Sequence, residues 1–139
     1  MTCTNKGQIS ASRSNEELKV EITDFINNNL KEKRIKHTYS VAAEARKLAE
    51  HYGEDPDKAE LAALFHDMFR SMTSAVLNMY IRQLGLPKKL IDNPNLSHAK
   101  IAAEIMKARY DILDEDIINA VAFHTTGRRG MSLLEKIIF

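Results

Sequence analysis

The stretch Ala62-Ala63-Leu64-Phe65-His66-Asp67 ends an apolar run with an imidazole and a carboxylate side by side. Burying a carboxylate beside an aliphatic wall is unfavourable unless a counter-charge or hydrogen bonds accompany it. A divalent metal ion supplies that counter-charge, and His and Asp are both suitable ligands for it. The alternative is that His66 and Asp67 merely end a helix at an exposed tip. For the dipeptide taken alone, this second interpretation is favoured.

The residues around this stretch have the spacing of helices. Asp55-Pro56 supplies an N-cap and a first-turn proline for a helix that runs to His66-Asp67. Ser14 and Glu17 form a capping box that opens an earlier helix. Apolar residues recur at helical spacing along the chain, and no stretch alternates as a β-strand does. The sequence therefore predicts an all-α fold, a bundle of about six or seven helices.

The other helices are predicted from their apolar faces and their end signals. Pro87 and Pro94 indicate that 86–96 is a bent linker with at most a short helix. We expect the remaining helices through His37 to Tyr52, closed by Gly53; from Thr73 or Ser74 to Gly85; from Ser97-His98 onward; from Asp114 to His124; and from Met131 or Ser132 to Ile138.

Composition and charge restrict the classes of function. A chain of 139 residues, 44% hydrophobic and 28% charged, is typical of one globular domain. The near-balance of 20 basic and 19 acidic residues argues against a nucleic-acid or membrane-surface protein. No apolar run approaches the roughly 18 residues that span a bilayer. Cys3 is the single cysteine, which excludes an intrachain disulfide, so we expect a cytoplasmic protein. The polar tail 1–13 is expected to be disordered.

The positions of the histidines change the balance for the His66-Asp67 pair. Of the five histidines, four fall at or near the ends of different predicted helices: His37, His66, His98 and His124. His37 is in phase with Val41 and Leu48 and is expected to point inward, whereas His51 is expected to be exposed. A single inward histidine is more often a satisfied core residue. Four of them with an adjacent Asp indicate a metal site built from several helices.

These residues resemble the HD-domain metal-dependent phosphohydrolases, and most closely the bacterial HD-domain hydrolases that cleave diadenosine tetraphosphate symmetrically. The His-Thr-Thr-Gly loop followed by Met-Ser is the specific part of the resemblance, which covers about residues 17–139. Four stretches carry it: Arg34-Ile35-Lys36-His37, Ala62-Ala63-Leu64-Phe65-His66-Asp67, Leu96-Ser97-His98-Ala99, and Ala120 to Arg128 with Met131-Ser132.

The resemblance implies that His37, His66 and Asp67 hold a metal ion, and that His98 and His124 complete a second position. Asp67 is then the bridging, catalytic carboxylate. The implied cofactor is a divalent metal, one ion or two, with iron favoured over manganese or another divalent ion. The HD pattern closes with a further Asp, expected just after Phe139, where this chain ends. The resemblance therefore implies an HD domain over 14–139 that is C-terminally incomplete.

Phosphoanhydride hydrolysis needs an activated water and neutralised phosphoryl charge. A bound metal lowers the pKa of water toward about 7, and a pair of ions about 3.5–4 Å apart holds the hydroxide in line. A polyphosphate also needs cations and donors that are not metal ligands. We expect these from Arg70 and from the loop Thr125, Thr126, Gly127 and Arg128, and expect Arg129 to be solvated.

The function expected is a metal-dependent hydrolysis of phosphoanhydride bonds, with diadenosine tetraphosphate cleaved into two ADP. One alternative is another HD-domain nucleotide phosphohydrolase, such as a nucleoside monophosphatase. The other is a non-catalytic nucleotide- or metal-binding module, because the closing Asp is missing. The expected partner is a nucleotide or dinucleoside polyphosphate rather than a nucleic acid or a membrane, and a homodimer is left open.

Overall fold

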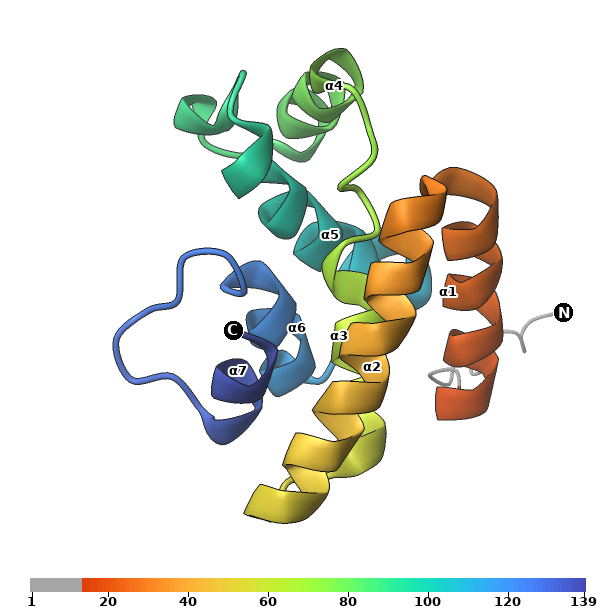
Figure 1. Ribbon diagram of the computed structural model, residues 1–139. Helices are drawn as coiled ribbons and strands as arrows, with labels where there is room; N and C mark the ends of the chain where they lie inside the picture. Colours follow the sequence, from red (N-terminus) through yellow and green to blue (C-terminus); the bar gives the residue numbers. More distant parts are fainter. Residues whose placement is uncertain (1–13) are drawn as a thin grey trace, which may run out of the picture.

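A computed structural model describes residues 14–139, and the tail 1–13 lies outside the described residues. Residues 14–139 form helices and no strand, which confirms the all-α bundle (Figure 1). The helices are α1 (Asn15–Asn29), α2 (Glu32–Tyr52), α3 (Pro56–His66), α4 (Ser74–Leu84), the short 3-10 helix η2 (Lys88–Leu90), α5 (Pro94–Tyr110), α6 (Glu115–Ala122) and α7 (Leu133–Ile138).

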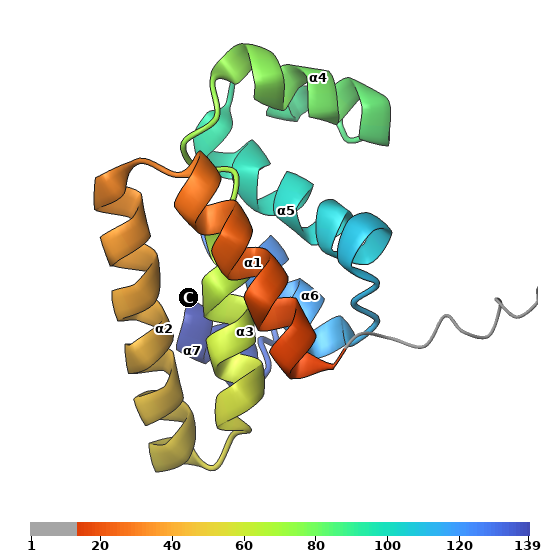
Figure 2. The same cartoon turned by 90° about the vertical axis from the view of Figure 1, so that its right-hand side faces the viewer.

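Helix α3 is the centre of the bundle. Its residues from Leu61 to His66 are all buried, as expected for a helix that is apolar on every side. The Asp55 side chain caps its first turn, and Pro56 takes the first helical position. Helices α1, α2, α5, α6 and α7 pack against it, and Figures 1 and 2 show it enclosed among them. The end of α3 therefore carries His66 and Asp67 into the interior.

Helix α2 contacts α3 through a face one residue away from the predicted one. The sequence predicted an inward stripe through His37, Val41, Ala45, Leu48 and Tyr52. Of these only Ala45 is buried, together with Thr38, Ala42 and Ala49. Alanines allow two helices to approach closely, and the larger apolar side chains then flank the contact. His37 lies at the edge of this contact: its ring faces the buried Asp67, as predicted for an inward residue, but its side chain is 46% exposed.

Two helix boundaries also differ from the prediction. Helix α5 begins at Pro94, three residues before the expected start, because a proline at the first helical position gives up no helical hydrogen bond. His98 is therefore inside the helix and buried, at 1% exposure. Helix α6 ends at Ala122, and His124 lies in the turn that follows. His51 is exposed, as expected.

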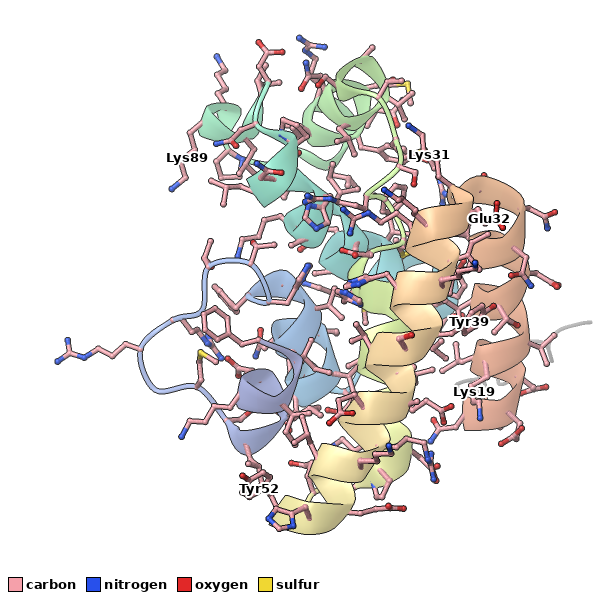
Figure 3. The ribbon with its side chains drawn as sticks, viewed as in Figure 1. Lys19, Lys31, Glu32, Tyr39, Tyr52 and Lys89 are labelled. Carbon is pink, nitrogen blue, oxygen red and sulfur yellow. The ribbon has the colours of Figure 1, made fainter. Side chains whose placement is uncertain are left out.

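Helices α4 and η2 form a corner at the start of α5, in the upper part of Figure 1. Thr73 caps α4, and Gly85 ends it with a φ of 68°. Figure 3 shows Lys89 of η2 extending outward from this corner. In the part of the chain that the structure describes, no helix has the length and apolar character needed to cross a membrane.

Candidate metal centre

Four histidine rings converge on the carboxylate of Asp67 from four separate parts of the chain. Its Oδ2 lies 3.5 Å from Nε2 of His37 and 3.3 Å from Nε2 of His66. Its Oδ1 lies 3.3 Å from Nε2 of His98 and 3.7 Å from Nε2 of His124. The five residues predicted as metal ligands are thus together. They form two groups suited to a metal ion, and both groups contain Asp67.

Backbone carbonyls orient three of the four rings. In each case Nδ1 lies within hydrogen-bond distance of a carbonyl three or four residues earlier, at 2.9 Å for His98 and 2.7 Å for His124. His66 makes the same contact with Ala63. A carbonyl accepts only from a protonated Nδ1, so in the neutral ring the Nε2 that faces Asp67 carries the lone pair. Histidines that ligate metals are commonly held in this way.

The spacing of these atoms fits a cation. The Nε2 atoms of His98 and His124 are 3.2 Å apart, and both face Asp67. Lone pairs that converge with a carboxylate repel one another unless a cation or protons lie among them. Metal–nitrogen bonds of about 2.1 Å, at octahedral to tetrahedral angles, separate neighbouring ligand atoms by about 3.0–3.4 Å. An imidazole and carboxylate set with this spacing fits a divalent transition metal.

The electrostatics of the centre favour the ionisation states that metals bind. Burial by itself raises the pKa of Asp67, but contacts with the rings of His124, His66 and His98 outweigh it and hold that pKa well below its usual range. Burial lowers the pKa values of His124 and His37. In both cases the nearby Asp67 opposes this shift but does not cancel it. An ionised carboxylate and neutral imidazoles are the forms that ligate a metal.

Two arginines lie on the His37 side of the centre. Nη1 of Arg34 is 3.4 Å from Oδ2 of Asp67. Burial is the main reason that the pKa of His37 is lowered, and the charges of Arg34 and Arg70 add to it. Sequence analysis singled out Arg70 and missed Arg34. Arg34 precedes His37 by three residues, a spacing that puts both side chains on one face of α2. This spacing could have identified Arg34 from the sequence.

The Thr125–Gly127 turn, which follows His124, is more exposed than the metal centre. Thr125 and Thr126 are exposed, and the Thr126 hydroxyl donates to the Gly127 carbonyl at 2.9 Å. Gly127 has a φ of 64°, and a side chain there would meet Phe139 at 3.1 Å. Both its conformation and its packing therefore require glycine.

Arg128 is held by an ion pair that the sequence analysis did not predict. Its Nε and Nη2 donate to the Glu135 carboxylate at 2.9 and 2.8 Å, and Glu135 on α7 is buried, at 3% exposure. The guanidinium also stacks on the Phe123 ring, 4.4 Å from its centroid. This pair draws the loop toward α7. Arg129 is exposed, as expected.

The family model of the HD domain matches residues 34–139, the part of the chain that contains every residue of the centre. The chain belongs to the HD domain family. HD domains bind divalent metals, and the two groups around Asp67 are where this HD domain has the residues to hold one.

Three curated relatives of this HD domain carry the same name. The bis(5'-nucleosyl)-tetraphosphatases (symmetrical) of Bacillus subtilis and Halalkalibacterium halodurans are 40% and 44% identical to it, over 82% and 80% of this chain. The Staphylococcus aureus protein of the same name is 39% identical over 79% of the chain. The chain spans 57–62% of the length of these relatives.

A solved structure has the same fold. It is a Clostridium acetobutylicum protein described as a predicted HD superfamily hydrolase involved in NAD metabolism, 40% identical, with a TM-score of 0.79. The match covers 92% of this chain and 67% of that one. The likeness therefore extends over almost the whole helical part, including α1, which precedes the region matched by the family model.

Proposed function

We propose that this HD domain is a metal-dependent phosphohydrolase that cleaves diadenosine tetraphosphate symmetrically into two ADP. The observation that carries the proposal is the convergence of four histidines on one buried carboxylate. The names of the relatives at 39–44% identity support the substrate class. Iron is the metal we favour, with manganese or another divalent ion as the alternative, because imidazole ligands suit iron.

The residues of the site have different proposed roles in binding metal and substrate. Asp67 with His37 and His66 holds one metal position, and Asp67 with His98 and His124 holds the other. A metal bound there activates water and neutralises phosphoryl charge. In the turn after His124 the Thr125 hydroxyl is available to donate to a phosphate oxygen, whereas the Thr126 hydroxyl must first leave the Gly127 carbonyl. Substrate-binding roles fall to Arg70, Thr125, Thr126, Gly127 and Arg128.

Arg34 and Arg128 refine this assignment. Arg34 adds a positive charge beside the His37 group, within reach of the same carboxylate oxygen. Glu135 engages only Nε and Nη2 of Arg128, which leaves Nη1 to donate to a phosphate. An Arg held by a buried carboxylate is also oriented in advance, so less side-chain freedom is lost when the phosphate binds.

The test is product analysis on the chain reconstituted with iron or with manganese. We expect diadenosine tetraphosphate to give ADP as the sole nucleotide product, whereas asymmetric cleavage would give AMP and ATP. A chain with His98→Gln serves as the control and should lose turnover. Faster hydrolysis of AMP than of the dinucleotide would favour a nucleoside monophosphatase. Metal binding without turnover of either substrate would favour a non-catalytic binding module.

A further inference from the structure

Lys100 is a half-buried cation with no carboxylate partner among residues 14–139. It lies on α5, and its Nζ stands 3.7 Å from the centroid of the Phe123 ring. Two other lysines are paired: Lys58 with Asp114 at 3.1 Å and Lys107 with Glu104 at 3.1 Å. A charge that is partly withdrawn from water without a counter-ion is unfavourable, so its position calls for an explanation.

A second cation shares the same ring. Arg128 Cζ is 4.4 Å from the Phe123 centroid. Because Lys100 Nζ is 3.7 Å from the same centroid, the two cationic groups are separated by less than twice 4.4 Å. Burial is the main reason that the pKa of Lys100 is lowered, and the charges of Arg128 and Lys89 lower it further. The face of an aromatic ring attracts one cation. The ring alone does not explain why two cations, which repel each other, both lie against it.

The Lys100–Phe123–Arg128 cluster is close in sequence to two residues of the second metal group, although residues two apart on a helix point to different faces. Lys100 follows His98 by two residues on α5, and Phe123 immediately precedes His124. A cavity of about 320 Å³ opens beside the cluster between η2, α5 and α6. Lys89, Lys100 and Phe123 are among its lining residues. The cavity has room for an anion, which would lie there near Lys89 and Lys100 and also near Glu104.

We propose that Lys100, the unused Nη1 of Arg128 and the edge of Phe123 form a phosphate-binding subsite for the part of the polyphosphate chain that lies beyond the scissile bond. The proposal rests on the proposed function and adds a residue to it. One phosphate can accept a charge-assisted N–H···O bond of about 2.7–2.9 Å on each of two sides. Such a phosphate would bridge Lys100 and Arg128 at their separation. The bound anion would relieve both the repulsion and the missing counter-charge.

The experiment compares Lys100→Met with Lys100→Arg in the full chain. Met keeps the aliphatic stem on Phe123 and removes the charge, whereas Arg restores the charge and the donors. The matched control is Lys47→Met, the same change at an exposed position on α2. The probes are inorganic tripolyphosphate, whose affinity is measured by calorimetry on manganese-loaded protein, and diadenosine tetraphosphate, for which kcat and KM are measured separately.

We expect Lys100→Met to weaken tripolyphosphate binding by roughly tenfold to a hundredfold, as for the loss of a hydrogen bond between charged groups. KM for the dinucleotide should rise by more than kcat falls, with metal content and Tm unchanged. Lys100→Arg should recover most of the affinity, and Lys47→Met should match the wild type. If Lys100→Met lowers Tm, Lys100→Gln provides the same neutralisation without an added apolar group.

Two results would overturn the proposal. Wild-type affinity in Lys100→Met, in a chain whose wild type hydrolyses diadenosine tetraphosphate, would remove the subsite and leave the proposed function standing. An equal loss in Lys47→Met would show a diffuse charge effect instead of a site. A wild-type chain that neither binds tripolyphosphate nor hydrolyses the dinucleotide would overturn the subsite and the proposed function together.

Discussion

The metal centre and the 125–131 loop are neighbours in the chain, but they are held in different ways. In the centre, His66, His98 and His124 are oriented by carbonyls three or four residues away, inside a packed core. The loop is mostly exposed, and its Arg128 is fixed by a carboxylate seven residues away on α7. One region is set by local geometry and core packing, and the other depends strongly on one ion pair.

This difference implies that the two regions respond differently to mutation. The ligands of the centre are already spaced for a cation, so we expect it to be largely formed before metal binds. The loop has few buried apolar contacts of its own, and such segments open locally at lower free energy than the core. Breaking the ion pair should therefore loosen the loop without dismantling the centre.

The largest effect is expected for Asp67→Asn. Asp67 is the one residue that both ligand groups share, and an amide offers a neutral oxygen in place of the carboxylate. Metal affinity should fall by at least about a hundredfold, more than is typical for a residue behind the ligands. The measurement is metal content after dialysis against a weak chelator. Tm of the metal-free protein should fall, because the lowered pKa of Asp67 means that its charge stabilises the fold.

Asp57→Asn is the control for this change, since Asp57 is an exposed partner of Arg46 and lies away from the histidines. It should retain wild-type metal content. Full occupancy in Asp67→Asn would show that the histidines alone hold the metal and that the shared carboxylate is not its anchor.

The next effect concerns the packing that carries His37. Ala42→Leu places a larger side chain in the α2–α3 contact, where Ala42 is 4% exposed. Overpacking of this kind destabilises by about 1–3 kcal/mol. Val41→Ala, on the flank of the contact, should cost less than about 1 kcal/mol. Urea denaturation measures both. A larger loss for Val41→Ala would restore the stripe predicted from the sequence.

That wrong stripe shows where sequence reasoning stops. Large apolar residues at helical spacing predicted α2 correctly, but its buried face consists of small residues, Ala42, Ala45 and Ala49. Helix faces that meet closely favour small side chains. Because small side chains are only weakly hydrophobic, an apolar periodicity pattern does not detect such a face. The core helix α3 was easier to predict, because a continuous apolar run leaves no choice of face.

The candidate site divides in the same way. His37, His66, His98 and His124 were predicted as a group because ligand chemistry restricts residue types. The pairing of Arg128 with Glu135 was not, because any of the acidic residues was an equal candidate without the fold. Lys100 gave no signal at all, since what distinguishes it is the partner it lacks.

The loop is tested by Glu135→Gln. Gln keeps the size and one acceptor but removes the charge that holds Arg128, so residues 125–131 should exchange their amide hydrogens about tenfold faster. Metal content should stay at the wild-type level. Mass spectrometry of peptides from the loop and from α3 measures the difference. Glu104→Gln, in an exposed pair with Lys107, should change neither region. Loss of metal in Glu135→Gln would show that loop and centre form one unit.

The smallest effect is expected where α6, the helix that ends just before His124, begins. Asp114 caps α6 by accepting from the backbone N–H groups of Asp116 and Ile117, and its Oδ2 lies 3.1 Å from Nζ of Lys58. Burial tends to raise the pKa of Asp114, but Lys58 and the two N–H groups outweigh it and lower that pKa. A carboxyl whose pKa is lower in the folded state stabilises the fold fully above its unfolded pKa, and this contribution is lost as pH falls through the folded pKa.

Asn caps a helix about as well as Asp, so Asp114→Asn removes the charge and leaves the cap. The variant should be less stable than the wild type by no more than about 1 kcal/mol near pH 6.5, because the pair is partly exposed. The gap in Tm should begin to close near the unfolded pKa of about 3.9. It should disappear only below the lower folded pKa, where the wild-type carboxyl is also neutralised. A gap that stays constant with pH would mean that the cap, and not the charge, is what Asp114 contributes to the α3–α6 support of the centre.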